Sequence, residues 1–270
     1  MAKLYLGSRE ITPIVKKESQ PTKFLWYELN NGVLSGGIGR YVSYTFTGHE
    51  FDGITEIGQY AFYLAFNNAQ NVDGFVNFSS LKTVGLYALG NCFTNSSIND
   101  IDLSSLEDVS AYGLYHTFQF CYDIIKENLD LSSLKTIGNY GMEDAFGEDD
   151  GLSGKLDLSS LTTVGDYGLR WAFYYSEFSS VDFKSLTSLG QQALSGAFDE
   201  CDYLKNIYFN SLKTTSFGSY TNQFNNMISD CNGVTLHFPS NMQSTISGLT
   251  GYPLFGGTNT TLAFDLPATS

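Results

Sequence analysis

A short apolar motif recurs along most of this chain. Its opening aliphatic residue falls at Ile54, Leu81, Leu106, Leu134, Leu161, Leu186 and Leu212, at intervals of 27, 25, 28, 27, 25 and 26 residues. Such a period is typical of solenoids, in which stacked coils share one core because no single coil can bury its own apolar face. The repeat therefore predicts one elongated body with an end piece on either side.

Each unit contains the same three segments. The first alternates apolar and polar residues, as in Leu156-Asp-Leu158, and predicts a strand. The second ends on a glycine, as in Val164-Gly165, which predicts a tight turn or a positive φ. The third predicts a short helical turn that ends on phenylalanine. These phenylalanines are expected to form a buried spine: Phe66, Phe93, Phe118, Phe146, Phe173 and Phe198.

The residues outside the repeat divide the chain into three parts. We expect a β-rich cap or attachment module at 1–50, a solenoid of about seven units at 51–233, and a C-terminal cap at 234–270. Pro239 closes a predicted strand and favours a sheet edge there, since proline cannot donate to a further ladder. The predicted class is α/β: a leucine-rich-repeat solenoid with a parallel sheet on one face and short helices or turns on the other.

Net charge excludes one class of partner. The chain carries 28 acidic against 14 basic residues, a net charge of −14. Nucleic acid is therefore not expected as a partner, because binding it needs lysine and arginine to displace counterions. No apolar run is long enough to span a bilayer, so membrane insertion is not expected. The first residues lack a secretory signal, which predicts release by lysis or a signal trimmed away.

The unit resembles a known repeat. Ile54-Thr-Glu-Ile-Gly-Gln-Tyr-Ala-Phe62 is similar to the BspA-type leucine-rich repeat of bacterial surface proteins, as are Cys121 and Cys201, three residues after the phenylalanine. The resemblance covers roughly residues 54–240 and implies a right-handed solenoid used in adhesion or recognition, with no catalytic residues. The units here are longer than the family's, and Leu-Asp-Leu-Ser-Ser replaces its usual proline-bearing strand end.

The start of the chain resembles a second group. Met1-Ala-Lys-Leu-Tyr-Leu-Gly-Ser8 is similar to the opening of many phage tail and baseplate-associated proteins. This resemblance spans fewer than ten residues. It implies a virion component, which would leave the cell by lysis and need no signal peptide.

A column of acidic residues is the first candidate binding site. Asp102, Asp130, Asp157 and Asp182 share one outward strand position in successive units, and Tyr208 continues the column. Like charges on adjacent strands repel, so the recurrence needs a reason. One hypothesis is a row that binds cations or the hydroxyl groups of a glycan. The alternative is a solvated stripe relieved by nearby serines, which themselves are expected to satisfy backbone groups at the bend.

A tyrosine column follows the glycines by two residues, at Tyr60, Tyr87, Tyr112, Tyr140 and Tyr167. Packing in the core with the hydroxyl at the rim is the commoner arrangement for such a column. The alternative is a partly exposed aromatic ladder that contacts a sugar or a protein.

The remaining reactive residues predict no catalytic or metal centre. Cys92, Cys121, Cys201 and Cys231 are expected to be buried free thiols, and three histidines, His49, His116 and His237, lie at non-equivalent positions without zinc spacing. The acidic segment Glu143–Asp150 could hold calcium but lacks the ligand pattern of an EF-hand loop, so a solvated insertion is expected.

Together these patterns favour a non-enzymatic protein without a cofactor. We expect recognition or adhesion, with a repeat surface presented to a protein or glycan on a bacterial surface or phage particle. The alternative is a structural spacer or virion component with no specific ligand. The expected location is extracellular, at the cell surface or in a virion, and the sequence does not indicate an oligomeric state.

Overall fold

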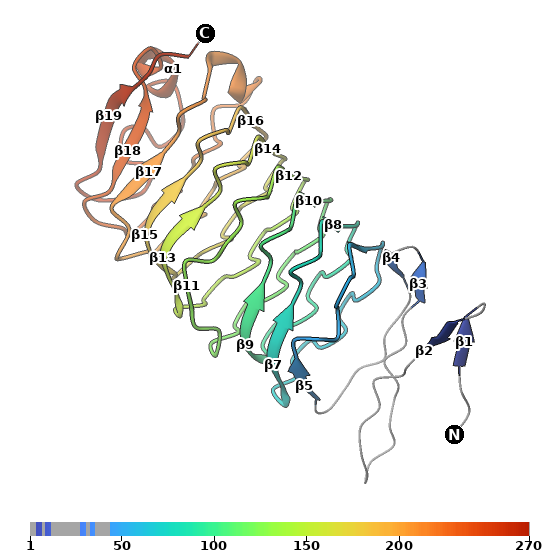
Figure 1. Ribbon diagram of the computed structural model, residues 1–270. Helices are drawn as coiled ribbons and strands as arrows, with labels where there is room; N and C mark the ends of the chain where they lie inside the picture. Colours follow the sequence, from blue (N-terminus) through green and yellow to red (C-terminus); the bar gives the residue numbers. More distant parts are fainter. Residues whose placement is uncertain (1–3, 7–8, 12–27, 31–32, 36–43, 270) are drawn as a thin grey trace.

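The chain forms a solenoid of stacked coils. The computed structural model describes residues 4–6, 9–11, 28–30, 33–35 and 44–269. In Figure 1 the coils follow one another from β5 to the C-terminal strand β19, with long strands along one side and short strands along another. The phage-like opening Met1–Ser8 falls largely outside the described residues, apart from 4–6.

The longer strands, together with the two-residue β11, form two parallel sheets on the same side of the molecule. One sheet holds β5 (Tyr44–Thr47), β7 (Val72–Asn77) and β9 (Ser97–Asp102). The other holds β11 (Lys126–Glu127), β13 (Leu152–Asp157), β15 (Glu177–Asp182), β17 (Asn206–Tyr208), β18 (Thr235–Pro239) and β19 (Thr261–Leu266). Buried and partly exposed residues alternate along β7, as the apolar–polar pattern predicts.

The segments that end on the glycine, such as Val164-Gly165, form a further sheet, which the sequence did not predict. It consists of two-residue strands: β6 (Glu56–Ile57), β8 (Thr83–Val84), β10 (Asp108–Val109), β12 (Thr136–Ile137), β14 (Thr163–Val164) and β16 (Ser188–Leu189). The hairpin of β3 (Glu28–Asn30) and β4 (Val33–Ser35) extends it, because β4 pairs in parallel with β6. A separate antiparallel pair joins β1 (Leu4–Leu6) and β2 (Arg9–Ile11).

The third segment of each described unit forms turns rather than the short helices that were the other expectation. From Tyr140 to Glu148, alternate N–H groups donate to carbonyls of the next coil, from Asp166 to Tyr174. A helix needs those same N–H groups for its own carbonyls. Within the described residues the only helical pieces are η1 (Thr214–Phe217) and α1 (Gln243–Ile246), and neither is long or apolar enough to span a membrane. The fold is therefore a parallel β-solenoid rather than α/β.

The phenylalanine spine is confirmed. From Phe66 to Phe198 the rings stack coil upon coil, with centroids 5.3–5.7 Å apart and planes within 10° of parallel. All six rings are at most 1% exposed. Burial of this kind is the largest favourable contribution available to such a chain.

Two expectations about backbone positions are corrected by the structure. Pro239 does not mark the sheet edge, because β19 pairs in parallel with β18, and Pro239 lies opposite Leu266 just past a register shift. Gly165 does not adopt a positive φ. It is required by close approach, since a Cβ there would lie 2.5 Å from Asn139 Oδ1 and 2.7 Å from the Asn139 nitrogen in the preceding coil.

Candidate functional site

The tyrosine column lies on the face formed by the turn segments. Each of its five residues adopts a φ of 52–58°, in the left-handed region. The N–H of each tyrosine then points along the solenoid axis and donates to a carbonyl of the following coil, as Tyr140 does to Asp166. Neighbouring tyrosines are consequently brought into register one coil apart.

The rings form a continuous stacked ladder from Tyr60 to Tyr167. Successive centroids are 5.3, 4.4, 4.8 and 4.8 Å apart, and the planes deviate by 5–11°. Tyr60 is 47% exposed and the other four rings are partly exposed. The structure thus favours the partly exposed ladder over packing in the core. Because the ring faces cover one another, the ladder presents ring edges and hydroxyls outward.

Further aromatic and cationic groups border the tyrosine ladder. Tyr63 packs edge-on against Tyr60 and Tyr87, at 6.1 and 5.7 Å. Tyr115 packs against Tyr112 at 5.6 Å. The Arg170 guanidinium lies 4.8 Å from the Tyr167 ring centroid and 4.7 Å from that of Trp171, which is 42% exposed. We call these residues and the tyrosine ladder together the tyrosine face.

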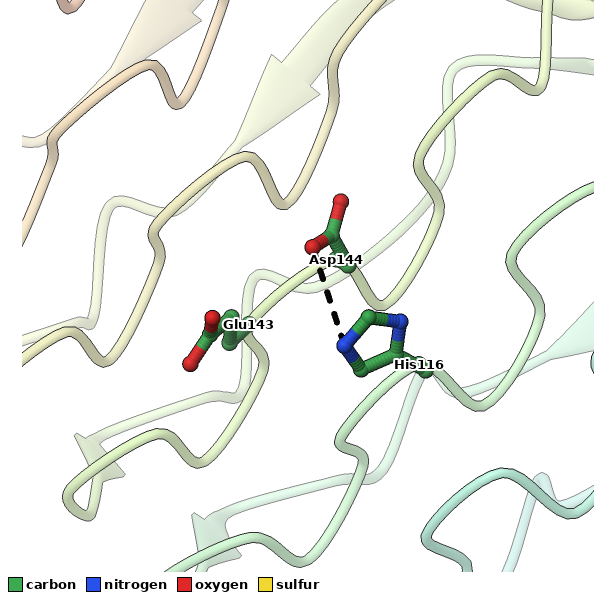
Figure 2. Close-up of side chains that lie close together, drawn as sticks. All are labelled: His116, Glu143 and Asp144. Atoms are coloured by element: carbon green, nitrogen blue, oxygen red, sulfur yellow. Dashed lines mark ion pairs between the residues drawn. The ribbon is translucent and has the colours of Figure 1, made fainter.

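A polar cluster of His116, Glu143 and Asp144 lies in the same turn segments. The Tyr115 ring lies between this cluster and the tyrosine ladder. Figure 2 shows the His116 imidazole facing Asp144, with Glu143 beside it. His116 Nε2 is 3.7 Å from Asp144 Oδ2, and one ligand atom from each of the three residues lies within 4.8 Å of the other two. In the described part of the chain, no other set of three such residues is this close.

Burial governs the protonation of this polar cluster. It raises the pKa of Asp144 to about 7, an effect that the Glu143 carboxylate reinforces and the Arg170 guanidinium opposes. Burial also lowers the pKa of His116, so the imidazole is neutral near neutral pH. Glu143 is 2% exposed and accepts from Arg170 Nε through Oε1, at 2.9 Å, while its Oε2 has no partner.

The acidic segment 143–150 is therefore not the solvated insertion that the sequence suggested. Glu143, Asp144 and Asp149 are all buried, at 2%, 8% and 0% exposed. The segment is the turn region of an ordinary coil, and it begins three residues before the spine residue Phe146. Aligning the units on the spine would have revealed the cluster, since His116 and Asp144 each lie two residues before a spine phenylalanine.

The aspartate column is only partly brought together. Asp130, Asp157, Asp182 and Tyr208 are successive partners across the six-stranded sheet and its adjoining bridge, whereas Asp102 pairs with Asn77 in the other sheet. A shallow depression of about 310 Å³ beside the column is lined by Asp130 and Asp157, and also by Lys155. That lysine adds a positive charge to a lining that the cation hypothesis requires to be acidic.

A local structural role explains the recurring aspartates. The Oδ1 atoms of Asp102, Asp130 and Asp157 accept the N–H of the serine two residues on, at 2.9–3.0 Å. Such Asx turns satisfy the backbone where a strand ends. At the end of the column, the Tyr208 ring is covered by the His237 ring, at 4.5 Å.

The serines and cysteines stabilise the coils. Ser133 donates to the Ser104 carbonyl and Ser211 to the Lys184 carbonyl, both at 2.7 Å in the preceding coil. All four cysteines are free and buried, which confirms the prediction of free thiols. The Cys121 and Cys201 thiols donate to the carbonyls of Phe93 and Phe173, and burial raises the pKa of Cys121 to about 12.

Comparison with known proteins finds similarity among solved structures alone. No protein-family model matches this sequence, and no curated protein matches it. A leucine-rich repeat protein of T. pallidum is 20% identical, with a TM-score of 0.46 over 90% of this chain and 100% of its own. A leucine-rich repeat protein from Bacteroides ovatus is 14% identical, with a TM-score of 0.29 over 90% of this chain and 76% of its own. The solenoid assignment rests on the strand register of this chain itself.

Proposed function

We propose that this protein is a non-enzymatic recognition solenoid that binds a protein partner through its tyrosine face. The tyrosine ladder carries the proposal. Five stacked tyrosines, flanked by Tyr63, Tyr115, Arg170 and Trp171, place on one face the residue types that dominate binding energy at protein interfaces.

The orientation of the rings favours a protein over a glycan. A sugar packs its C–H groups on the face of an aromatic ring, but each inner ring of the ladder has both faces covered by its neighbours. Ring edges and hydroxyls remain, and these suit hydrogen bonds to peptide groups and packing against apolar side chains. Stacking also fixes the tyrosine rotamers before binding, which lowers the entropic cost of association.

The resemblance to BspA-type repeats supports an inference about where in the organism this binding takes place. We infer that the chain acts outside the cell, on a bacterial surface or a phage particle, and that its acidic charge of −14 keeps the solenoid soluble there. A structural spacer would have no need for an exposed ladder of large aromatic rings.

An array of secreted and cell-surface proteins, probed beside a glycan array, tests the proposal. The wild-type chain is compared with a variant carrying Tyr87→Asn, Tyr112→Asn and Tyr140→Asn. Asparagine suits the left-handed backbone at these positions, as Asn91 and Asn95 show at φ of 52° and 54°. A control variant carries Tyr122→Ser and Tyr203→Ser, which are 56% and 60% exposed and lie off the ladder.

We expect protein signals that the ladder variant loses and the control variant keeps. Binding on the glycan array alone would replace the protein partner with a carbohydrate. Signals that survive in the ladder variant would place recognition on another face, and no signal on either array would favour the spacer.

A further inference from the structure

We propose that His116, Glu143 and Asp144 form a binding site for a divalent transition-metal cation, of which Zn²⁺ is the representative. This site is distinct from the tyrosine ladder, and its occupancy does not depend on the proposed protein partner. An imidazole nitrogen and two carboxylate oxygens form a donor set that Zn²⁺ accepts and that Ca²⁺, with its preference for six to eight oxygens, does not.

The first observation is the close approach of two potential ligand atoms, His116 Nε2 and Asp144 Oδ2. Gln119 Oε1 lies 2.5 Å from His116 Nδ1 and accepts its N–H, so the lone pair of the neutral imidazole is on Nε2. That lone pair faces Asp144 Oδ2 at 3.7 Å, which is longer than a direct hydrogen bond. Two ligands on one tetrahedral zinc lie ~3.3 Å apart, given bonds of ~2.0–2.1 Å. The observed gap therefore needs little adjustment to admit a cation.

The second observation is the unpartnered oxygen of Glu143. Its side chain is 3% exposed, and Oε2 makes no hydrogen bond although Oε1 accepts from Arg170. A buried carboxylate oxygen without a partner is costly unless something else occupies it. The Glu143 carboxylate lies beside the Asp144 and His116 ligand atoms, within 4.8 Å of both.

The surroundings match the outer shell of a metal site. Ligating histidines donate their second nitrogen to a carbonyl or carboxylate, and ligating carboxylates are themselves hydrogen-bonded. Gln119 holds His116 in this way, and Arg170 holds Oε1 of Glu143. His116 and Arg170 are 20% and 26% exposed in their side chains, so the cluster lies just under the surface.

The test is calorimetric titration of the full, reduced, chelator-treated chain with Zn²⁺ at pH 7.5, with Ca²⁺ as a comparison. His116→Asn and Asp144→Asn remove one ligand each. Asparagine is accepted at this unit position, because Asn91 occupies it two coils before Asp144 with the same left-handed φ. The matched control is His237→Ala, which removes an imidazole paired with the single carboxylate of Asp265 at 2.9 Å.

We expect one Zn²⁺ per chain, a rise in melting temperature with Zn²⁺ and no response to Ca²⁺. Both asparagine variants should lose this binding, and His237→Ala should keep it. Gln119→Leu should weaken it about 10–100-fold, as loss of an outer-shell partner does. Absence of heat and of thermal stabilisation in the wild-type chain would overturn the proposal, as would Zn²⁺ binding that survives both His116→Asn and Asp144→Asn.

Discussion

Bulky residues in the left-handed conformation define this fold at the level of single residues. Tyr140, Asp144 and Glu148, spaced four apart, all have a φ of 51–65°. This conformation costs roughly 1–2 kcal/mol for a residue with a Cβ. Each such residue recovers that free energy by an N–H···O bond to the next coil and, for tyrosine, by ring stacking. The sequence predicts a tight turn or a positive φ at the glycine, because glycine adopts that conformation most easily, but does not mark the tyrosine two residues later, where the positive φ occurs.

Asp149 should be a weak point of the present sequence. It occupies the small-residue position that Ser96, Cys121 and Ser176 fill in neighbouring coils. It is 0% exposed, and neither carboxylate oxygen makes a hydrogen bond of good geometry, although the Cys121 backbone partly offsets the effect of burial. Asp149→Ser should therefore raise the free energy of unfolding by about 1–3 kcal/mol at pH 8, measured by urea denaturation.

The sign of the pH dependence follows from the burial of Asp149. Burial raises the pKa of its carboxyl well above that in the unfolded chain, so the folded state retains the proton more strongly. Wild-type stability then falls as pH rises above about 4, where the unfolded carboxyl ionises. The gain from Asp149→Ser should shrink between pH 8 and pH 5. A gain of equal size at both values would show that the charge is not the cause.

A substitution of Gly165 tests whether the close approach between coils requires glycine at this position. A Cβ at this position would lie 2.7 Å from the Asn139 nitrogen, which belongs to rigid backbone. Gly165→Ala should therefore destabilise the chain by about 1–3 kcal/mol in urea denaturation, as overpacking does. The control is Ser110→Ala, because Ser110 fills the equivalent position one coil before Gly138 and is exposed. Equal midpoints for the two variants would contradict the close-approach explanation.

At the level of elements, the long strands and the spine were predictable and the turn face was not. Alternation in segments such as Leu156–Leu158 predicts strands directly, and phenylalanines in register predict stacking. The segment from Tyr140 to Phe146 reads as helical because helices and these turns both space their apolar residues by about four. The carbonyl that accepts from each of these N–H groups belongs to the next coil. The turn conformation therefore depends on residues that are distant in the sequence.

A substitution of Phe146 tests whether the phenylalanine spine stabilises the coils. Its ring is fully buried between Phe118 and Phe173, with centroids 5.3 and 5.6 Å away. Phe146→Ala should lower the free energy of unfolding by about 3–5 kcal/mol, measured by chemical denaturation. Tyr122→Ala, at an exposed ring outside the spine, serves as the control. An unchanged midpoint for Phe146→Ala would show that the spine does not stabilise the coils.

At the scale of the whole molecule, the sides of the solenoid differ in the continuity of their sheets and in the side chains they carry. The short-strand sheet runs without interruption from β4 to β16, whereas the long-strand side divides between β9 and β11. A Lys126–Asp100 ion pair of 2.8 Å crosses that division. The side formed by the turn segments, here called the turn face, carries both the tyrosine face and the buried polar cluster. The aspartate column lies on the side of the long strands, where its side chains accept hydrogen bonds in Asx turns. Recognition is therefore expected on the turn face.

The affinity of one ladder variant tests that claim most directly. The dissociation constant of the strongest protein hit from the array is measured for the wild-type chain, Tyr112→Asn and Tyr203→Ser. Tyr112 lies at the centre of the ladder, stacked at 4.4 and 4.8 Å on its neighbours, and its loss should weaken binding at least about tenfold, the cost of a central interface tyrosine. Tyr203→Ser should leave the constant within about twofold. The reverse pattern, with Tyr203 needed and Tyr112 dispensable, would contradict recognition by the tyrosine face.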